Sequence, residues 1–190
     1  MTISLDTLRR DFLALLGESP GLSPILEEDE EAAVLLLEDR IRVNLLPLAI
    51  EATLETPLLW LDDIESVDAE AQPSATGSIR ISLPDNYLRL YSLKLAGWKE
   101  AVSDTEPEGS LRCRLGANTP FWMACNENPL VIERRDTRGH YLHVCGVTTA
   151  KPVVEHLLYV VKPSVSNDTL RISAAAYPRL LDKLALTARS

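Results

Sequence analysis

The sequence predicts an α+β fold in which N-terminal and C-terminal helices pack together, with an inserted antiparallel β-sheet or small sandwich of about six strands. Two observations predict this class. Near both ends of the chain, apolar residues recur every three or four positions, as on one face of a helix. Between these ends, apolar and polar residues alternate in about six short stretches, as in strands with one buried face. Helices, then strands, then a helix indicate an α+β architecture.

Length and composition agree with a globular chain. The 190 residues are 46% apolar and 25% charged. Folding a chain of this size buries about 70% of the surface that the unfolded chain exposes. These values exclude intrinsic disorder, a collagen-like chain and a disulfide-stapled miniprotein.

The first predicted helix covers residues 5–16. Ser4 or Asp6 is the candidate N-cap, and Gly17 ends the helix. Its apolar stripe consists of Leu5, Leu8, Phe12, Leu15 and Leu16. Prolines follow in the next few residues, so this stretch is predicted to be a connector.

The second predicted helix runs from Glu27 to about Leu46. Pro47 should kink or restart it, and helical spacing resumes as far as Leu54. Thr56-Pro57 closes the helix, and the sequence LLWLDDI then forms a short packed segment. The apolar stripe consists of Val34, Leu37, Ile41, Leu45 and Leu48.

A polar, turn-rich stretch separates the helical part from the strands. The predicted organisation is an N-terminal helical part (1–65), a linker (66–78), a β part (79–163) and a C-terminal helix (164–190) that packs on the N-terminal helices in one compact unit. The helical pattern returns at Asp168, and Pro178 interrupts it or divides it in two.

Six stretches show strand-like patterns, and residues 103–110 and 116–129 are predicted loops. Pro84, Asp85 and Asn86 form a turn between the first two strands. The predicted strands are 79–83, 87–95, 111–115, 130–132, 141–145 and 154–161.

Charge is distributed unevenly along the chain. The net charge is −9, from 28 acids and 19 bases. Residues 1–70 hold 17 acids and 4 bases (−13), which leaves 11 acids and 15 bases (+4) for residues 71–190. An acidic chain is a poor general nucleic-acid binder. The asymmetry indicates either unlike faces that steer partners or a solvated acidic helix surface.

The cysteines and the hydropathy pattern favour a protein made in the cytoplasm that stays soluble. Cys113, Cys125 and Cys145 form no CxxC pair, as expected of reduced thiols. No signal-peptide pattern occurs. The longest apolar stretch, 45–50, contains a proline and is too short to span a bilayer. No membrane partner is predicted.

The sequence predicts no catalytic residue, no cofactor and no metal site. His140 and His143 are three residues apart in a predicted strand, so they point to opposite faces. Cys145 lies on the same face as His143, but a Cys–His nucleophile would also need an orienting acid and an oxyanion site. Phosphate-loop, metalloprotease and nucleophile-elbow motifs do not occur. The tryptophans are interpreted as core or subunit-contact anchors: Trp60, Trp98 and Trp122.

Residues 77–102 carry a resemblance to a known family. They contain Leu83, Pro84, Asp85, Asn86 and Tyr87, followed by Gly97 and Trp98. This stretch resembles the middle segment of bacteriophage and prophage head–tail adaptor proteins, also called head-completion or tail tubular protein A-like proteins. Asn86 stands where that family often has an acid. The similarity extends in weaker form over most of residues 30–188.

The resemblance implies a structural subunit of a head–tail connector ring, usually twelve-fold, without catalysis. The implied partners are the portal protein, tail proteins and further copies that form a ring on the partner; DNA would only pass non-specifically through the channel. The implied location is the host cytoplasm during assembly and then the virion. We expect acids among Glu27–Glu31, or Asp62, Asp63 and Glu65, to face a lumen or a neighbour. The closing helix (170–186) or the loop 103–110 is expected to contact the portal.

Two other classes remain open at this point. One is a stand-alone intracellular protein-interaction domain with no phage role. The other is a small hydrolase that uses Cys145 or a histidine.

Overall fold

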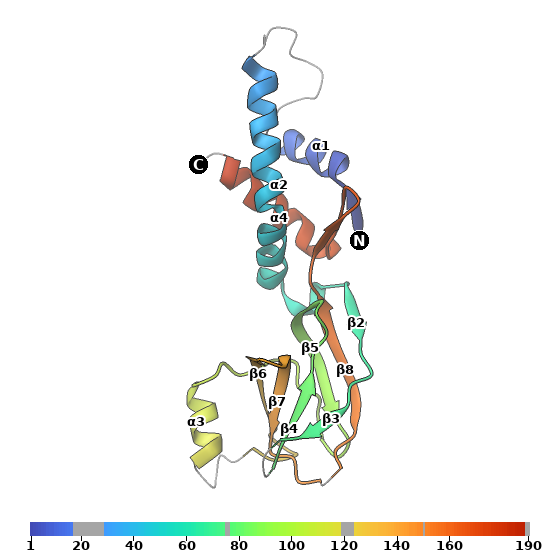
Figure 1. Cartoon of the computed structure of the whole chain (residues 1–190), viewed down its shortest axis with the longest axis vertical. Helices are drawn as coiled ribbons and strands as arrows, with labels where there is room; N and C mark the ends of the chain where they lie inside the picture. The colour runs from blue at the N-terminus through green and yellow to red at the C-terminus, as the bar shows by residue number, and fades with distance from the viewer. Residues whose placement is uncertain (17–28, 75–76, 119–123, 150, 189–190) are drawn as a thin grey trace. The chain divides into compact units, whose positions relative to one another are not determined.

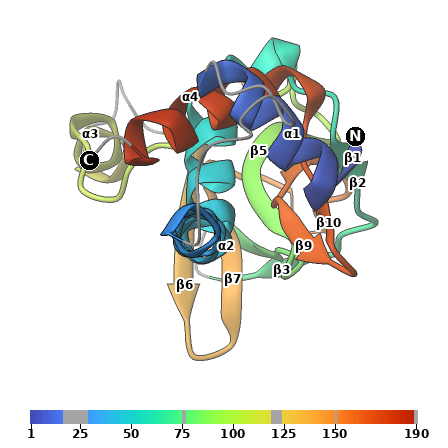
Figure 2. The same cartoon turned by 90° about the horizontal axis from the view of Figure 1, so that it is seen from above.

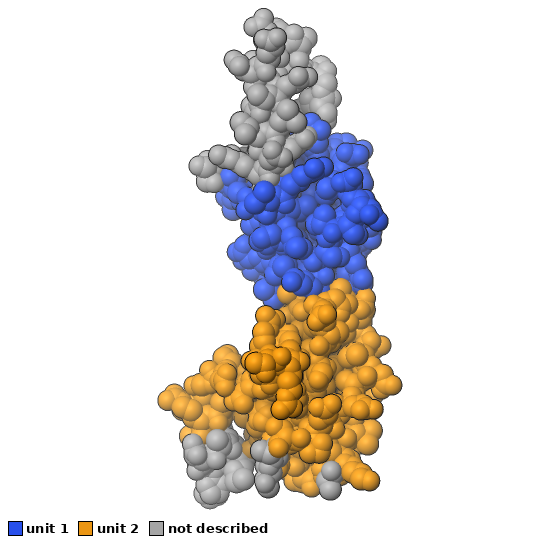
Figure 3. All heavy atoms as spheres, in the orientation of Figure 1, with its two compact units in different colours: residues 1–63, 162–190 blue, residues 64–161 orange. Residues whose placement is uncertain are grey.

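The computed structural model describes residues 1–16, 29–74, 77–118, 124–149 and 151–188. Over these residues it confirms the predicted α+β class, with four α-helices and ten strands in three antiparallel sheets. The chain divides into two compact units, one made of 1–63 with 162–190 and the other of 64–161 (Figure 3). None of the described helices is long and apolar enough to cross a membrane.

The first unit is mainly helical. Its helix α4 packs against both α1 and α2, so the predicted packing of the terminal helices is confirmed (Figure 1, Figure 2). A small sheet with the strand order β1-β10-β9 joins the two ends of the chain. The elements are β1 (Thr2–Ser4), α1 (Leu5–Leu16), α2 (Asp29–Glu55), η1 (Leu58–Trp60), β9 (Ser164–Ser166), β10 (Thr169–Arg171), η3 (Ala174–Ala176) and α4 (Tyr177–Ala188).

Helix α1 begins where the sequence predicts it. The backbone N–H of Thr7 donates to Ser4 Oγ at 3.1 Å, so Ser4 is the N-cap. Leu8 and Phe12 are buried, and they anchor the apolar face of the helix. Leu15, the next member of the predicted stripe, is exposed.

Helix α2 continues through Pro47 without a restart. Pro47 is exposed, whereas Leu45, Ala49 and Ala52 are buried. Pro47 has no backbone N–H, so the helix lacks one hydrogen bond at this exposed position. The packing of the buried residues on the opposite face of the helix offsets that loss. The predicted stripe residues Val34, Leu37 and Ile41 lie outside the side chains that the structure describes.

Pro178 does not divide the last helix. It is the second residue of α4, in the first turn, where a backbone N–H has no intrahelical partner.

The prediction of helix from Asp168 onward is confirmed for residues 177–188, which form α4, and is wrong for residues 168–173. Residues 164–171 form the hairpin β9–β10, in which Ser166 pairs with Thr169. Asn167 and Asp168 have φ values of 48° and 55°, as a two-residue hairpin turn requires. Leu170, the first apolar residue of the predicted helix, belongs to β10, which pairs with β1 at the N-terminus.

Asp62 connects η1 to the segment that leads into α4. Its Oδ1 accepts from Ser173 Oγ at 2.5 Å and from the backbone N–H of Ala174 at 3.0 Å. The bond from Ser173 is the main cause that holds the pKa of Asp62 below its usual value of 3.8. Two distant parts of the chain, 111 residues apart, are thereby held together.

We expect Ser173→Ala to lower the free energy of unfolding at pH 7 by about 1 kcal/mol, because Asp62 loses a hydrogen bond but is exposed. A carboxylate with a lowered pKa stabilises the fold above its unfolded pKa, and this contribution is lost as the pH falls through the folded pKa. Urea unfolding from pH 7 to pH 3 should show the difference shrinking below about pH 4. Ser164→Ala, at an exposed strand position, is the control. An effect that does not change with pH would contradict this account.

The second unit contains two antiparallel sheets. One has the order β2-β8-β5 and the other β3-β4-β7-β6. Both contribute to one buried core, which includes Ile81 and Leu142 from one sheet and Leu93 and Leu157 from the other. The elements are β2 (Ile64–Ser66), β3 (Ala71–Pro73), β4 (Ser78–Ser82), β5 (Tyr87–Leu95), α3 (Leu111–Asn118), β6 (Leu130–Asp136), β7 (Gly139–Cys145) and β8 (Val154–Val161). The predicted linker 66–78 thus contributes strands to this unit.

Residues 111–115, predicted as a strand, belong to helix α3. Ser110 Oγ accepts from the N–H of Cys113 at 3.2 Å and caps the helix. Leu111 is 63% exposed, so the alternation of Leu111, Cys113 and Leu115 does not mark a buried strand face. A pattern of five residues is too short to separate the two periods.

Candidate functional site

The turn at residues 83–87 links the two sheets of the second unit. It leads from β4 of one sheet to β5 of the other. The N–H of Tyr87 donates to the carbonyl of Pro84 at 3.1 Å, which closes the predicted turn. The N–H of Leu83 donates to the carbonyl of His140 at 3.0 Å and so fixes the turn to β7.

On one side of the turn, Asn86 belongs to a polar cluster. Its Nδ2 donates to Glu65 Oε2 at 3.0 Å. The Tyr159 hydroxyl lies 3.0 Å from the same Glu65 oxygen and 2.9 Å from Asn86 Oδ1. The carboxylate of Glu65 is thereby held between an amide and a phenol, and the turn is joined to β2 and β8.

On the other side, Tyr87 contacts β6 and β7. Its hydroxyl donates to Glu133 Oε2 at 3.1 Å, and His140 Nε2 lies 2.8 Å from Glu133 Oε1. The Tyr87 ring meets His140 edge-on at 5.2 Å and stacks on Tyr159 at 5.8 Å. Burial, more than the nearby Glu133, raises the pKa of Tyr87. The hydroxyl therefore stays protonated and acts as a donor to Glu133.

The remaining motif residues also serve the fold. Gly97 has a φ of 88°, a conformation that glycine adopts without strain, and it ends β5. Trp98 is buried in the same core as Tyr87, whereas Asp85 is exposed at the tip of the turn. The motif thus organises the core of the second unit, and its polar atoms bond to neighbours within that unit.

An amide at position 86 suits the polar cluster, because its Nδ2 donates to the Glu65 carboxylate. We expect Asn86→Asp to lower the free energy of unfolding by about 2 kcal/mol at pH 7, because Glu65 loses a donor and gains a second carboxylate beside it. Urea unfolding at pH 7 and pH 4 should show a smaller loss at the lower pH, where the carboxylates begin to protonate. Asp85→Asn, the reverse change at the exposed neighbour, should have almost no effect. Equal effects from both variants would contradict this role of Asn86.

The Cys–His pair of β7 lacks the features of a nucleophile. His140 contacts Glu133 and Tyr87 at the core side of the sheet, and the alternation of β7 puts His143 and Cys145 on the other face, as predicted. Burial is the main cause that raises the pKa of the Cys145 thiol, and burial with nearby Arg134 lowers the pKa of His143. Both shifts favour the neutral forms, whereas a catalytic cysteine needs its thiolate.

A contact that sequence reasoning missed joins Ser92 to His156. Ser92 Oγ and His156 Nε2 lie 2.9 Å apart on the adjacent strands β5 and β8. Nothing in the sequence indicates this contact, because the two residues are 64 positions apart. Within the described part of the chain, no acid is bonded to the other nitrogen of this histidine, so the contact lacks the third member of a catalytic triad.

The predicted acidic surface is only partly described. The side chains of Glu27–Glu31 lie outside the described residues. Asp63 forms a bidentate ion pair with Arg171 at 3.0 and 2.6 Å. Asp62 accepts hydrogen bonds from Ser173 and Ala174, and Glu65 accepts them from Asn86 and Tyr159.

Exposed large apolar side chains are concentrated in the helical unit. Leu59 and Trp60 are adjacent in η1 and are 86% and 66% exposed. Trp98, in contrast, is a core residue, and Trp122 lies outside the described residues. Over the described residues, the exposed large apolar side chains of this unit are Met1, Leu15, Val43, Leu54, Leu59, Trp60, Val165 and Leu186, and those of the other unit are Leu111 and Val153.

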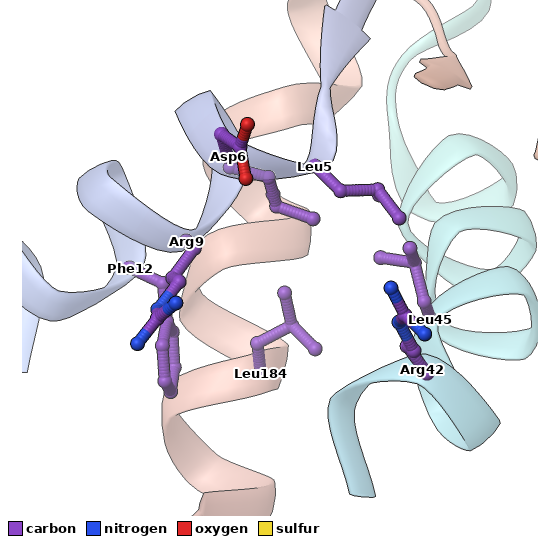
Figure 4. A pocket seen from close by; sticks show the side chains of 8 residues that line it. Leu5, Asp6, Arg9, Phe12, Arg42, Leu45 and Leu184 are labelled. Atoms are coloured by element: carbon purple, nitrogen blue, oxygen red, sulfur yellow. The ribbon is translucent and has the colours of Figure 1, made fainter. Parts of the chain in front are cut away.

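The same unit contains a hollow of about 120 Å³ between α1, α2 and α4 (Figure 4). Its apolar lining comes from all three helices. Arg9 of α1 and Arg42 of α2 stand on two sides of it, and Leu184 of α4 lies between them (Figure 4). The complete lining is Leu5, Asp6, Leu8, Arg9, Phe12, Arg42, Leu45 and Leu184.

No protein-family model matches the chain. No curated protein is significantly similar to it in sequence.

Proposed function

We propose that this chain is a structural, non-catalytic subunit of a phage or prophage head–tail connector ring that bridges the portal and the tail. The observation that carries the proposal is the adjacent, exposed pair Leu59 and Trp60 on the helical unit. Tryptophan is enriched at the energetic centres of protein–protein interfaces. An exposed Leu-Trp pair therefore favours a chain that binds other proteins.

The resemblance around residues 83–87 is the reason for proposing a head–tail connector as the assembly. The turn joins the two sheets of the second unit, as a motif that maintains a family fold would. In this proposal the portal and tail proteins are the partners, further copies complete the ring, and no cofactor is needed. DNA passes without specific contacts, and the net charge of −9 supports passage rather than binding.

The portal contact is assigned to α4 or to the loop 103–110. The predicted closing helix is shorter than expected, since 169–171 form β10 and α4 starts at Tyr177. Deletion of residues 185–190 should weaken binding if α4 makes the contact, and a loop contact should survive the deletion.

Co-purification tests this function. The full chain is mixed with a candidate portal protein from the same genome, already assembled as a ring, and the portal is captured by a tag. Retention of the chain at a fixed ratio to the portal is expected, with Asp85→Asn as a variant that should bind equally well. If a folded chain fails to bind an assembled portal, the connector proposal is overturned.

The second candidate function is a stand-alone protein-interaction domain. The same Leu59–Trp60 pair favours it, because an exposed apolar pair fits any protein partner. This second function predicts that the chain does not bind portal or tail proteins and binds another protein through η1. The neutral form favoured at Cys145 makes a hydrolase the weakest of the three readings.

A further inference from the structure

We draw no further inference here: the strongest candidate, the exposed apolar side chains of α2 and η1 in the helical unit (Val43, Leu54, Leu59 and Trp60), carries none, because nothing in the part of the chain that the structure describes shows what covers them.

Discussion

Gly146→Ala is expected to lower the free energy of unfolding more than any other single-methyl change among the described residues. Gly146 follows β7 with a φ of 83°, where an L residue is strained. A Cβ built there would overlap the backbone of Ala124 and Cys125. Backbone cannot move aside as the end of a side chain can. We expect a loss of about 3 kcal/mol or more, from left-handed strain together with overpacking.

Gly109→Ala is the matched control, because Gly109 has the same φ of 83° and no atom within 4 Å of the added Cβ. It should cost only the left-handed strain, about 1–2 kcal/mol. Urea unfolding followed by circular dichroism measures both variants. If Gly146→Ala and Gly109→Ala lowered the free energy of unfolding equally, this would contradict the close approach of the Ala124 backbone to Gly146.

Trp98→Ala has the second large expected effect. Trp98 is 4% exposed and belongs to the core formed by both sheets of the second unit. Removing a buried tryptophan side chain costs about 3–5 kcal/mol, through lost burial and the cavity left behind. Trp98→Phe should recover part of this loss, because it keeps an aromatic ring in the same place.

Trp60→Ala supplies the comparison with the same chemical change at the surface. Trp60 is 66% exposed, so at concentrations where the chain is monomeric its loss should change stability by about 0.5 kcal/mol or less. Fluorescence-monitored urea unfolding distinguishes the two cases. A large effect from Trp60→Ala in the monomer would mean that this side chain supports the fold of its own chain rather than a contact with another.

The longest and most regular elements could be predicted from the sequence. Strands β5 and β8 and helix α1 have the predicted bounds, because each carries a strand-like apolar run or a helical stripe that ends near a glycine, a proline or a cap. The turn at Pro84 was also predictable, since proline followed by Asp and Asn favours a turn.

Short strands could not be predicted. Strands β1, β2, β3, β9 and β10 have three residues each, too few for a period to appear. They are stabilised by pairing with distant segments, as Ile3 pairs with Leu170. The turn at Asn167 and Asp168 was the one local signal of β9–β10, and the apolar spacing after it favoured helix instead.

The features of the candidate site depend on contacts between residues far apart in sequence. The turn itself was predictable, but its partners Glu65, Glu133 and Tyr159 come from three other strands. The hollow likewise requires Phe12, Leu45 and Leu184 to meet. Single-sequence patterns identify faces of elements, and they do not identify which faces pack together.

The mass of the complex tests the central claim most directly. The assembled portal ring is mixed with excess chain, isolated by size exclusion, and measured by light scattering at protein concentrations where both proteins are folded. We predict a defined complex whose added mass corresponds to an integral ring of 21.0 kDa chains, with one chain for each portal subunit. An unchanged portal mass would contradict the claim that this chain is a connector subunit.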